Sequence, residues 1–250
     1  MLELSPRQAQ QPAGRPAAQA LPGLRLINAS WIAPLAGAIS GFLLWLAFPP
    51  VDLGFVAFLA LVPLALVFRG ASWGRASAAG AAFGIVFFGL LLDWLRQFGW
   101  APFLALTLGQ TMWVVVFLHA GVTARRNIGD RWAAFVFPLA FLAGEFTRAY
   151  LPLGGFTWGG LGYSQHDYVA FLKLASYTGV WGLSLVVAAV GGLVAEAVAT
   201  GVKRRGRGVV LVLFAAGLVL VPGLLPAGSP QGRKATVAMV QGNLPLSDQG

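Results

Sequence analysis

The feature that most constrains this chain is a series of seven apolar segments, each close to the length that crosses a lipid bilayer. A membrane-spanning helix needs roughly 17–25 mostly apolar residues. Lipid offers no hydrogen-bond partners to exposed amides, so such segments must be helical. We predict spans at residues 31–48, 53–68, 76–95, 102–124, 132–150, 169–200 and 209–225. The expected fold is therefore an all-α polytopic membrane protein with about seven transmembrane helices, the sixth of them long enough to tilt or to extend along the interface.

Composition supports this interpretation. The chain is 58% hydrophobic and only 10% charged, whereas soluble domains average about 25% charged residues. Its net charge of +9 does not indicate nucleic-acid binding, because the basic residues fall in short clusters between apolar segments. The sequence contains no cysteine, which excludes disulfides, thiolate metal sites and a cysteine nucleophile within these 250 residues.

The basic clusters also predict an orientation. Arginine and lysine concentrate before the first segment and in the second, fourth and sixth connections: Arg7, Arg15, Arg25, Arg69, Arg75, Arg125, Arg126, Arg131, Lys203, Arg204, Arg205 and Arg207. Positively charged connections stay in the cytoplasm. We therefore expect a cytoplasmic N-terminus, with residues 1–30 as a disordered tail. A secretory signal is the competing interpretation of this region, but the following apolar run is long for one and favours an uncleaved first span.

The fifth segment acquires two charged residues, Glu145 and Arg148, just before it breaks into a stretch rich in glycine and aromatic residues. Residues three apart share a helix face and can form an ion pair. Two interpretations stay open: a structural ion pair at the helix end, or an Arg148 that binds a lipid phosphate while Glu145 holds it in place. Trp158 and Tyr163 in the following stretch are side chains that favour the membrane–water boundary.

Other features have structural interpretations. Gly37 with Gly41 and Gly80 with Gly84 are spaced four apart, which predicts close helix packing. His119 is interpreted as a packed neutral histidine, and Glu196 as a carboxylate that reaches the inner interface. No metal-ligand spacing or Ser–His–Asp pattern occurs in the sequence.

The character of the chain changes after the seventh segment. A proline-rich linker precedes Ala-Thr-Val-Ala-Met-Val at 235–240, which reads as one buried β-strand. A single strand does not fold alone. We therefore divide the chain into the tail 1–30, a transmembrane helical domain 31–226, and a linker with the start of an incomplete outward-facing α/β domain at 227–250.

Four short motifs in the second half of the chain form one recognisable set. They are Glu145-Phe-Thr-Arg148, Gly155-Phe-Thr-Trp158, Leu161-Gly-Tyr163-Ser-Gln165 and Val240-Gln-Gly-Asn243-x-Pro245. This set resembles the signature of bacterial apolipoprotein N-acyltransferases over about residues 33–245. Thr157 stands where that family commonly has proline, which leaves the Trp158 match intact.

The resemblance implies an enzyme of the bacterial cytoplasmic membrane that moves an acyl chain from a phospholipid to the N-terminal amine of a diacylglyceryl lipoprotein. It implies that catalysis belongs to a nitrilase-like domain on the outer face, with a Glu–Lys–Cys triad. This chain has no cysteine, so we expect the membrane part of such an enzyme, a fragment without catalytic residues that is inactive alone. Cofactors, metals and nucleic-acid partners are not expected. The candidate substrate- or lipid-facing residues are Glu145, Arg148, Trp158, Tyr163 and Gln165.

Two rival functions belong to other classes. A transporter or channel subunit would need polar or broken helices near the bilayer midplane, repeated in two halves, and no such repeat is visible in the sequence. A passive membrane anchor for an outer domain fits the helices but leaves the motifs at 145–165 unexplained. Solute flux in proteoliposomes distinguishes the transporter from the acyltransferase interpretation.

Overall fold

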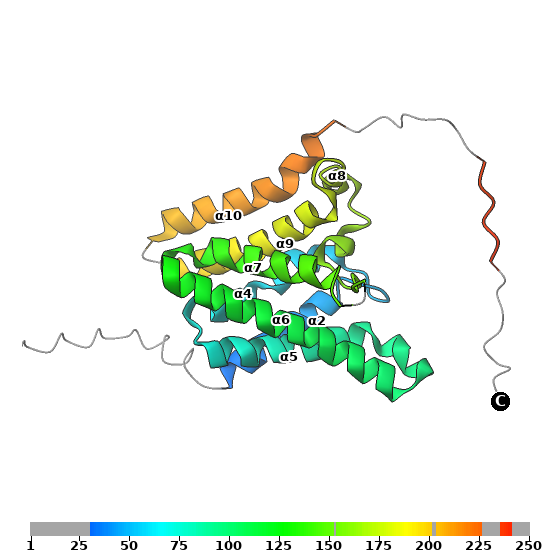
Figure 1. Ribbon diagram of the computed structural model, residues 1–250. Helices are drawn as coiled ribbons and strands as arrows, with labels where there is room; N and C mark the ends of the chain where they lie inside the picture. Colours follow the sequence, from blue (N-terminus) through cyan, green and yellow to red (C-terminus); the bar gives the residue numbers. More distant parts are fainter. Residues whose placement is uncertain (1–30, 153, 202–203, 227–235, 242–250) are drawn as a thin grey trace, which may run out of the picture.

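Antiparallel helices make up the body of the protein, as the computed structural model shows for residues 31–152, 154–201, 204–226 and 236–241 (Figure 1). The predicted tail at 1–30 lies outside these described residues. Helices occupy the position of every predicted span: α2 (Ile32–Trp45), α4 (Val62–Gly70), α5 (Trp73–Leu91), α6 (Trp100–Ile128), α7 (Ala133–Arg148), α9 (Ala175–Thr200) and α10 (Arg205–Leu220). Short helical turns connect them: η1 (Gly54–Val56), α3 (Ala57–Ala60), η2 (Asp93–Phe98), η3 (Asp130–Trp132), η4 (Leu161–Gln165), α8 (Val169–Leu172) and η6 (Val221–Leu224).

Four helices are long and apolar enough to cross a membrane: α5, α6, α9 and the continuous segment Arg205–Leu224. The helices Ile32–Trp45 and Gly54–Gly70 are apolar but shorter. The helical membrane fold is thus confirmed, whereas the number of seven spans stays a prediction.

The second predicted span is not one regular helix. Helix α3 ends at Ala60 and α4 begins at Val62, with Pro63 in its first turn, where the missing N–H would have no intrahelical partner in any case. The amide of Leu64, freed by this break, donates to the buried hydroxyl of Ser40 on α2 at 3.0 Å. Hydropathy averaged over the segment detects its apolar character but not the interruption.

The predicted glycine contacts are confirmed. Gly37 of α2 lies directly against the backbone of Ala79 on α5, and a methyl group on Gly84 of α5 would come within 2.7 Å of Thr111 on α6. Small residues at these positions let three helices approach closely, and van der Waals contact then stabilises the bundle.

The long sixth segment divides into α8 and α9, and α9 itself is kinked at Gly179, whose φ of 64° lies in the left-handed region. Glycine adopts this conformation without steric cost. The sixth segment is thus longer than its main helix by one separate helical turn, α8, and a tilt or an extension along the interface stays a prediction.

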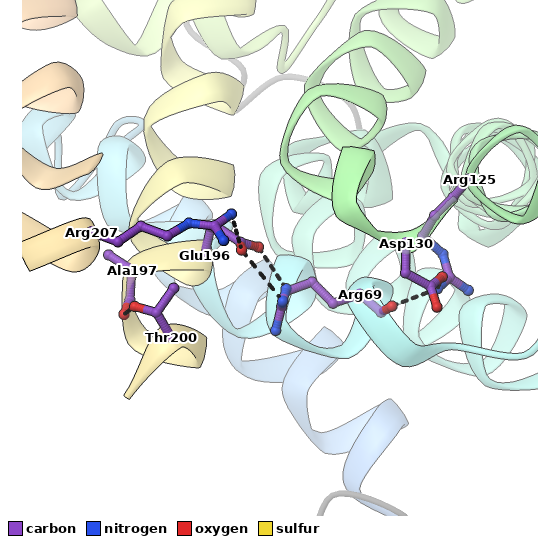
Figure 2. A network of polar contacts seen from close by, with 7 residues as sticks. All are labelled: Arg69, Arg125, Asp130, Glu196, Ala197, Thr200 and Arg207. Atoms are coloured by element: carbon purple, nitrogen blue, oxygen red, sulfur yellow. Dashed lines mark hydrogen bonds and ion pairs between the residues drawn. The ribbon is translucent and has the colours of Figure 1, made fainter. Parts of the chain in front are cut away.

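Arg69 of α4, Arg125 of α6 and Arg207 of α10 lie near one another at one end of the bundle, called here the arginine end (Figure 2). There Glu196 of α9 forms ion pairs with Arg69 Nε at 2.7 Å and Arg207 Nη2 at 3.3 Å. Glu196 is buried at 6% exposure. The expectation that it reaches the interface is corrected: two arginines from α4 and α10 fold over it, because a buried carboxylate requires neutralisation.

Two other sequence predictions differ from the structure. His119 is exposed and not packed in the interior; its ring stacks on Trp73 with centroids 5.7 Å apart. Residues 236–241, which include most of the predicted strand, carry no regular secondary structure and are exposed. A strand is defined by hydrogen bonds to a neighbour, and the described residues supply none to this segment.

Candidate functional site: an anchored loop and an aromatic groove

The loop after α7 is folded back onto the bundle by Arg148, the last residue of that helix. Arg148 Nη1 donates to the carbonyl oxygens of Phe156 at 3.0 Å and Trp158 at 2.9 Å, and to Gln110 Oε1 on α6 at 3.1 Å. Its own carbonyl accepts from the amide of Phe156 at 2.8 Å. The side chain is only 4% exposed. Arg148 therefore fixes the loop through main-chain atoms.

Glu145, one turn earlier, fixes the next part of the same loop. Its Oε1 accepts from the amide of Leu161 at 2.7 Å, and the neighbouring amide of Gly162 donates to Ser184 Oγ on α9 at 2.9 Å. The predicted ion pair between Glu145 and Arg148 is not formed directly, because each group points to a different segment of the loop. The two opposite charges are nevertheless buried close together, which limits the cost of removing them from water.

Gln165 completes the anchoring at the far end of the loop. It is fully buried, and its Nε2 donates to the carbonyl of Gly54 at 2.9 Å and to Ser164 Oγ at 2.8 Å. Ser164 in turn donates to the carbonyl of Leu161 at 2.6 Å. Because Gly54 begins η1, this contact joins two segments 111 residues apart.

The anchored loop forms one wall of a groove of about 640 Å³ at this end of the bundle, called here the loop end. The side chains of Trp158 and Trp94 lie 5.7 Å apart between ring centroids. Trp158 is 52% exposed and Tyr163 45% exposed. The other walls come from the connection after α2, the end of α5 and η2. The main lining residues of this aromatic groove are Phe48, Leu91, Trp94, Trp158, Tyr163 and His166.

His166, which lines the groove, lies beside two carboxylates. His166 Nε2 lies 3.4 Å from Asp52 Oδ2 and 3.6 Å from Asp167 Oδ1. Their spacing in the sequence did not indicate a cluster, because Asp52 comes from the connection after α2. The contact joins this connection to the end of η4.

The five residues singled out from the sequence thus fall into two groups. Glu145, Arg148 and Gln165 are buried: the first two hold main-chain atoms of the loop, and Gln165 joins the loop to Gly54. Trp158 and Tyr163 face the groove. Sequence reasoning missed Gln110, Ser184 and Trp94. A signal existed for Gln110, because an amide in the middle of an apolar span requires a buried partner.

The fold and this site define an integral membrane protein of the helical class, with a loop packed into one end of its bundle. More particularly, the chain belongs to the apolipoprotein N-acyltransferase family, whose N-terminal domain matches residues 40–193.

Curated relatives agree with this assignment. The chain is 28% identical to the apolipoprotein N-acyltransferase of Geobacter metallireducens, over 84% of this chain and 43% of that protein. It is 30% identical to the enzyme of Gloeobacter violaceus, again over 84% of this chain and 43% of the relative. The Allorhizobium ampelinum enzyme is 28% identical, over 88% of this chain and 45% of the relative. The chain therefore spans less than half the length of these curated relatives.

Proposed function

We propose that this chain is the membrane part of a phospholipid:apolipoprotein N-acyltransferase of the bacterial cytoplasmic membrane. In this proposal the aromatic groove receives the acyl chains of the lipid substrates. The complete enzyme transfers one acyl chain to the N-terminal amine of a diacylglyceryl lipoprotein. The groove positions the lipid, and the residues that form and break bonds belong to a catalytic domain that follows α10.

The observation that carries the proposal is that the groove and the exit from α10 lie at the same end of the bundle. Lys173 Nζ, between α8 and α9, donates to the carbonyl of Gly223 at 2.8 Å, so η6, the helical turn that follows α10, lies at the loop end. A domain attached there would stand over the groove. The indole of Trp158 and the phenol of Tyr163 are well suited to the membrane–water boundary, because each ring combines an apolar body with a polar group.

The proposal includes seven antiparallel spans with the arginine end in the cytoplasm. The alternation of basic connections supports this orientation. The groove then opens at the outer boundary of the membrane, where lipoproteins are exposed after export. Glu145, Arg148 and Gln165 serve as positioning residues that keep Trp158 and Tyr163 at the groove.

The test is the acyl-transfer rate of the full-length enzyme carrying Trp158→Ala. Losing the contact of one large apolar side chain costs about 1.5–3 kcal/mol, so we expect kcat/KM for a labelled phospholipid to fall about tenfold or more. The matched control is Trp100→Ala, because Trp100 is exposed at the same end but does not line the groove. Equal losses in both variants, or a loss that only follows the amount of folded protein, would contradict the proposal.

A second measurement addresses this chain by itself. Attack on a phospholipid ester requires a nucleophile such as a thiolate, and the sequence contains no cysteine. We expect the purified chain to acquire no label from a phospholipid with a radioactive acyl group. Formation of a hydroxylamine-sensitive acyl-protein by this chain would show that the membrane part has chemistry of its own.

A further inference from the structure

A second concave site lies at the arginine end of the bundle, far along the helices from the aromatic groove. The α4–α5 connection and the end of α6 enclose a cleft of about 300 Å³. It is lined by Gly70, Ala71, Arg125, Arg126, Gly129 and Asp130. The acyl-transfer proposal assigns this cleft no role.

Arg125 forms a wall of the cleft and has little capacity left for a ligand. It is 3% exposed, and it donates to the carbonyl oxygens of Arg69 at 2.5 Å and Ala71 at 2.7 Å. It also forms an ion pair with Asp130 (Figure 2). The charges of Arg125 and Asp130 therefore neutralise one another within the wall.

Arg126 supplies the remaining positive charge. Its guanidinium lies over the indole of Trp73 at 4.9 Å from the ring centroid, and none of the described carboxylates pairs with it. Trp73 is itself held in place: its Nε1 donates to Thr123 Oγ1 at 3.2 Å, and the His119 ring stacks on it with an interplanar angle of 9°. The Trp73 ring is therefore fixed, and it orients the Arg126 guanidinium in the absence of a ligand.

We propose that this cleft binds the headgroup phosphate of an anionic phospholipid, with Arg126 as the principal ligand. Because the charges of Arg125 and Asp130 cancel, the residues that line the cleft carry one net positive charge, that of Arg126. Arginine matches phosphate oxygens in geometry and charge, and basic pockets between membrane helices are suited to acidic headgroups. The exposed indole of Trp73 beside Arg126 places the cleft at headgroup depth, where tryptophan is enriched. The site requires only that the protein lies in a membrane, so it stands independently of acyl transfer.

Gly70 offers a direct way to test the charge requirement. This residue lines the cleft, and a side chain added there would meet no atom within 4 Å. Gly70→Asp therefore places a carboxylate in the cleft without steric conflict, and Gly70→Asn is its neutral counterpart of nearly the same shape.

The experiment titrates the full chain in detergent micelles with phosphatidylglycerol or with zwitterionic phosphatidylcholine, and native mass spectrometry counts the bound lipids. We expect phosphatidylglycerol to fill one site at a lower concentration than phosphatidylcholine. Arg126→Gln should weaken that first site about fivefold, the effect of one basic residue near an anionic headgroup. Arg205→Gln removes the same charge from the same end but outside the cleft, and should leave the first site unchanged. Gly70→Asp should weaken it more than Gly70→Asn does.

Three results would overturn the proposal. Equal affinity for the two lipids would remove the preference for an anionic headgroup. Equal losses in Arg126→Gln and Arg205→Gln, together with equal behaviour of the two Gly70 variants, would show diffuse surface attraction only. Displacement of phosphatidylglycerol by millimolar inorganic phosphate would show that the cleft recognises a free anion and not a lipid.

Discussion

At the scale of single residues, Arg148 determines the shape of the loop end because it bonds to backbone carbonyls on both sides of Thr157. Replacing it with glutamine removes these charge-assisted bonds and leaves Glu145 buried without its nearby cation. Loss of such a group costs on the order of 3 kcal/mol. We expect Arg148→Gln to lower the melting temperature in detergent and to expose the 151–160 loop to proteolysis.

A suitable control for that variant is Arg96→Gln. Arg96 pairs with Asp93 at 2.5 Å, but both side chains are about half exposed. Exposed pairs contribute only about 0–1 kcal/mol. If the two variants unfolded at the same temperature, the anchoring role of Arg148 would be wrong.

Gly159 lies at the floor of the groove and gives a second residue-level prediction. Its φ is +75°, and an added methyl group would lie 3.2 Å from the ring of Phe87. Gly159→Ala should therefore destabilise the protein by about 1–3 kcal/mol, through both backbone strain and crowding. Gly154 also has positive φ, +90°, but open space around it, so Gly154→Ala should show the strain alone. A smaller loss in Gly159→Ala than in Gly154→Ala, measured by thermal unfolding, would contradict this account.

The residue scale also shows what the sequence could and could not predict. Glu145 and Arg148 lie within one turn at the end of α7, as their spacing indicates, but each binds a different part of the loop. Trp158 and Tyr163 are exposed, and their location at the membrane–water boundary stays a prediction. The spacing of residues along a helix does not show whether the loop after it folds back onto that helix. The main-chain partners of Arg148, at Phe156 and Trp158, therefore could not be predicted from the sequence. The contact of Trp158 with Trp94 was missed for the same reason.

At the scale of secondary-structure elements, α10 belongs to the least buried of the four segments long enough to cross a membrane. Only 11% of the most apolar window of Arg205–Leu224 is buried. Glu196 holds one end of the helix through Arg207, and Lys173 holds the other through Gly223. Polar contacts at the two ends therefore do much to fix its position.

We expect Glu196→Gln to loosen the arginine end of α10 by about 1–3 kcal/mol, because charge-assisted bonds to two arginines become weaker neutral ones. The chain has no cysteine, so Ala215→Cys would introduce a single thiol on α10, at a position that is 3% exposed. Maleimide labelling of this thiol should become faster in Glu196→Gln, whereas Asp93→Asn, an exposed carboxylate at the other end, should not change it. Unchanged labelling in Glu196→Gln would mean that packing on α9 alone holds the helix.

Helices and strands are predicted well from sequence where a single physical requirement decides the structure. Apolar length located the long helices of the described residues, because lipid-exposed backbone has no alternative to the helix. The prediction was less complete where the backbone preference of a single residue interrupts a helix, as at Pro63 in the second segment and at Gly179 in α9. Both depend on local backbone geometry, which averaged hydropathy does not contain.

At the scale of the whole molecule, the two ends of the bundle differ in chemistry, and this difference predicts its orientation. Asn127 is exposed near the arginine end and Leu151 near the loop end. In intact spheroplasts, a membrane-impermeant maleimide should label Leu151→Cys and not Asn127→Cys, and both should react after lysis. The reverse pattern would place the groove in the cytoplasm and remove the support for an outer catalytic domain.

The anchoring of the loop has a consequence for how this membrane part could diversify. Arg148 and Glu145 bind carbonyl and amide groups of the loop backbone, which every loop sequence possesses. Exposed side chains between Arg148 and Leu161, such as that of Thr157, are therefore not needed to hold the loop, whereas the buried Gly159 is constrained by its neighbours. A loop held by its backbone would allow the exposed side chains beside the groove to differ between related proteins while the helices and the path of the loop stay the same.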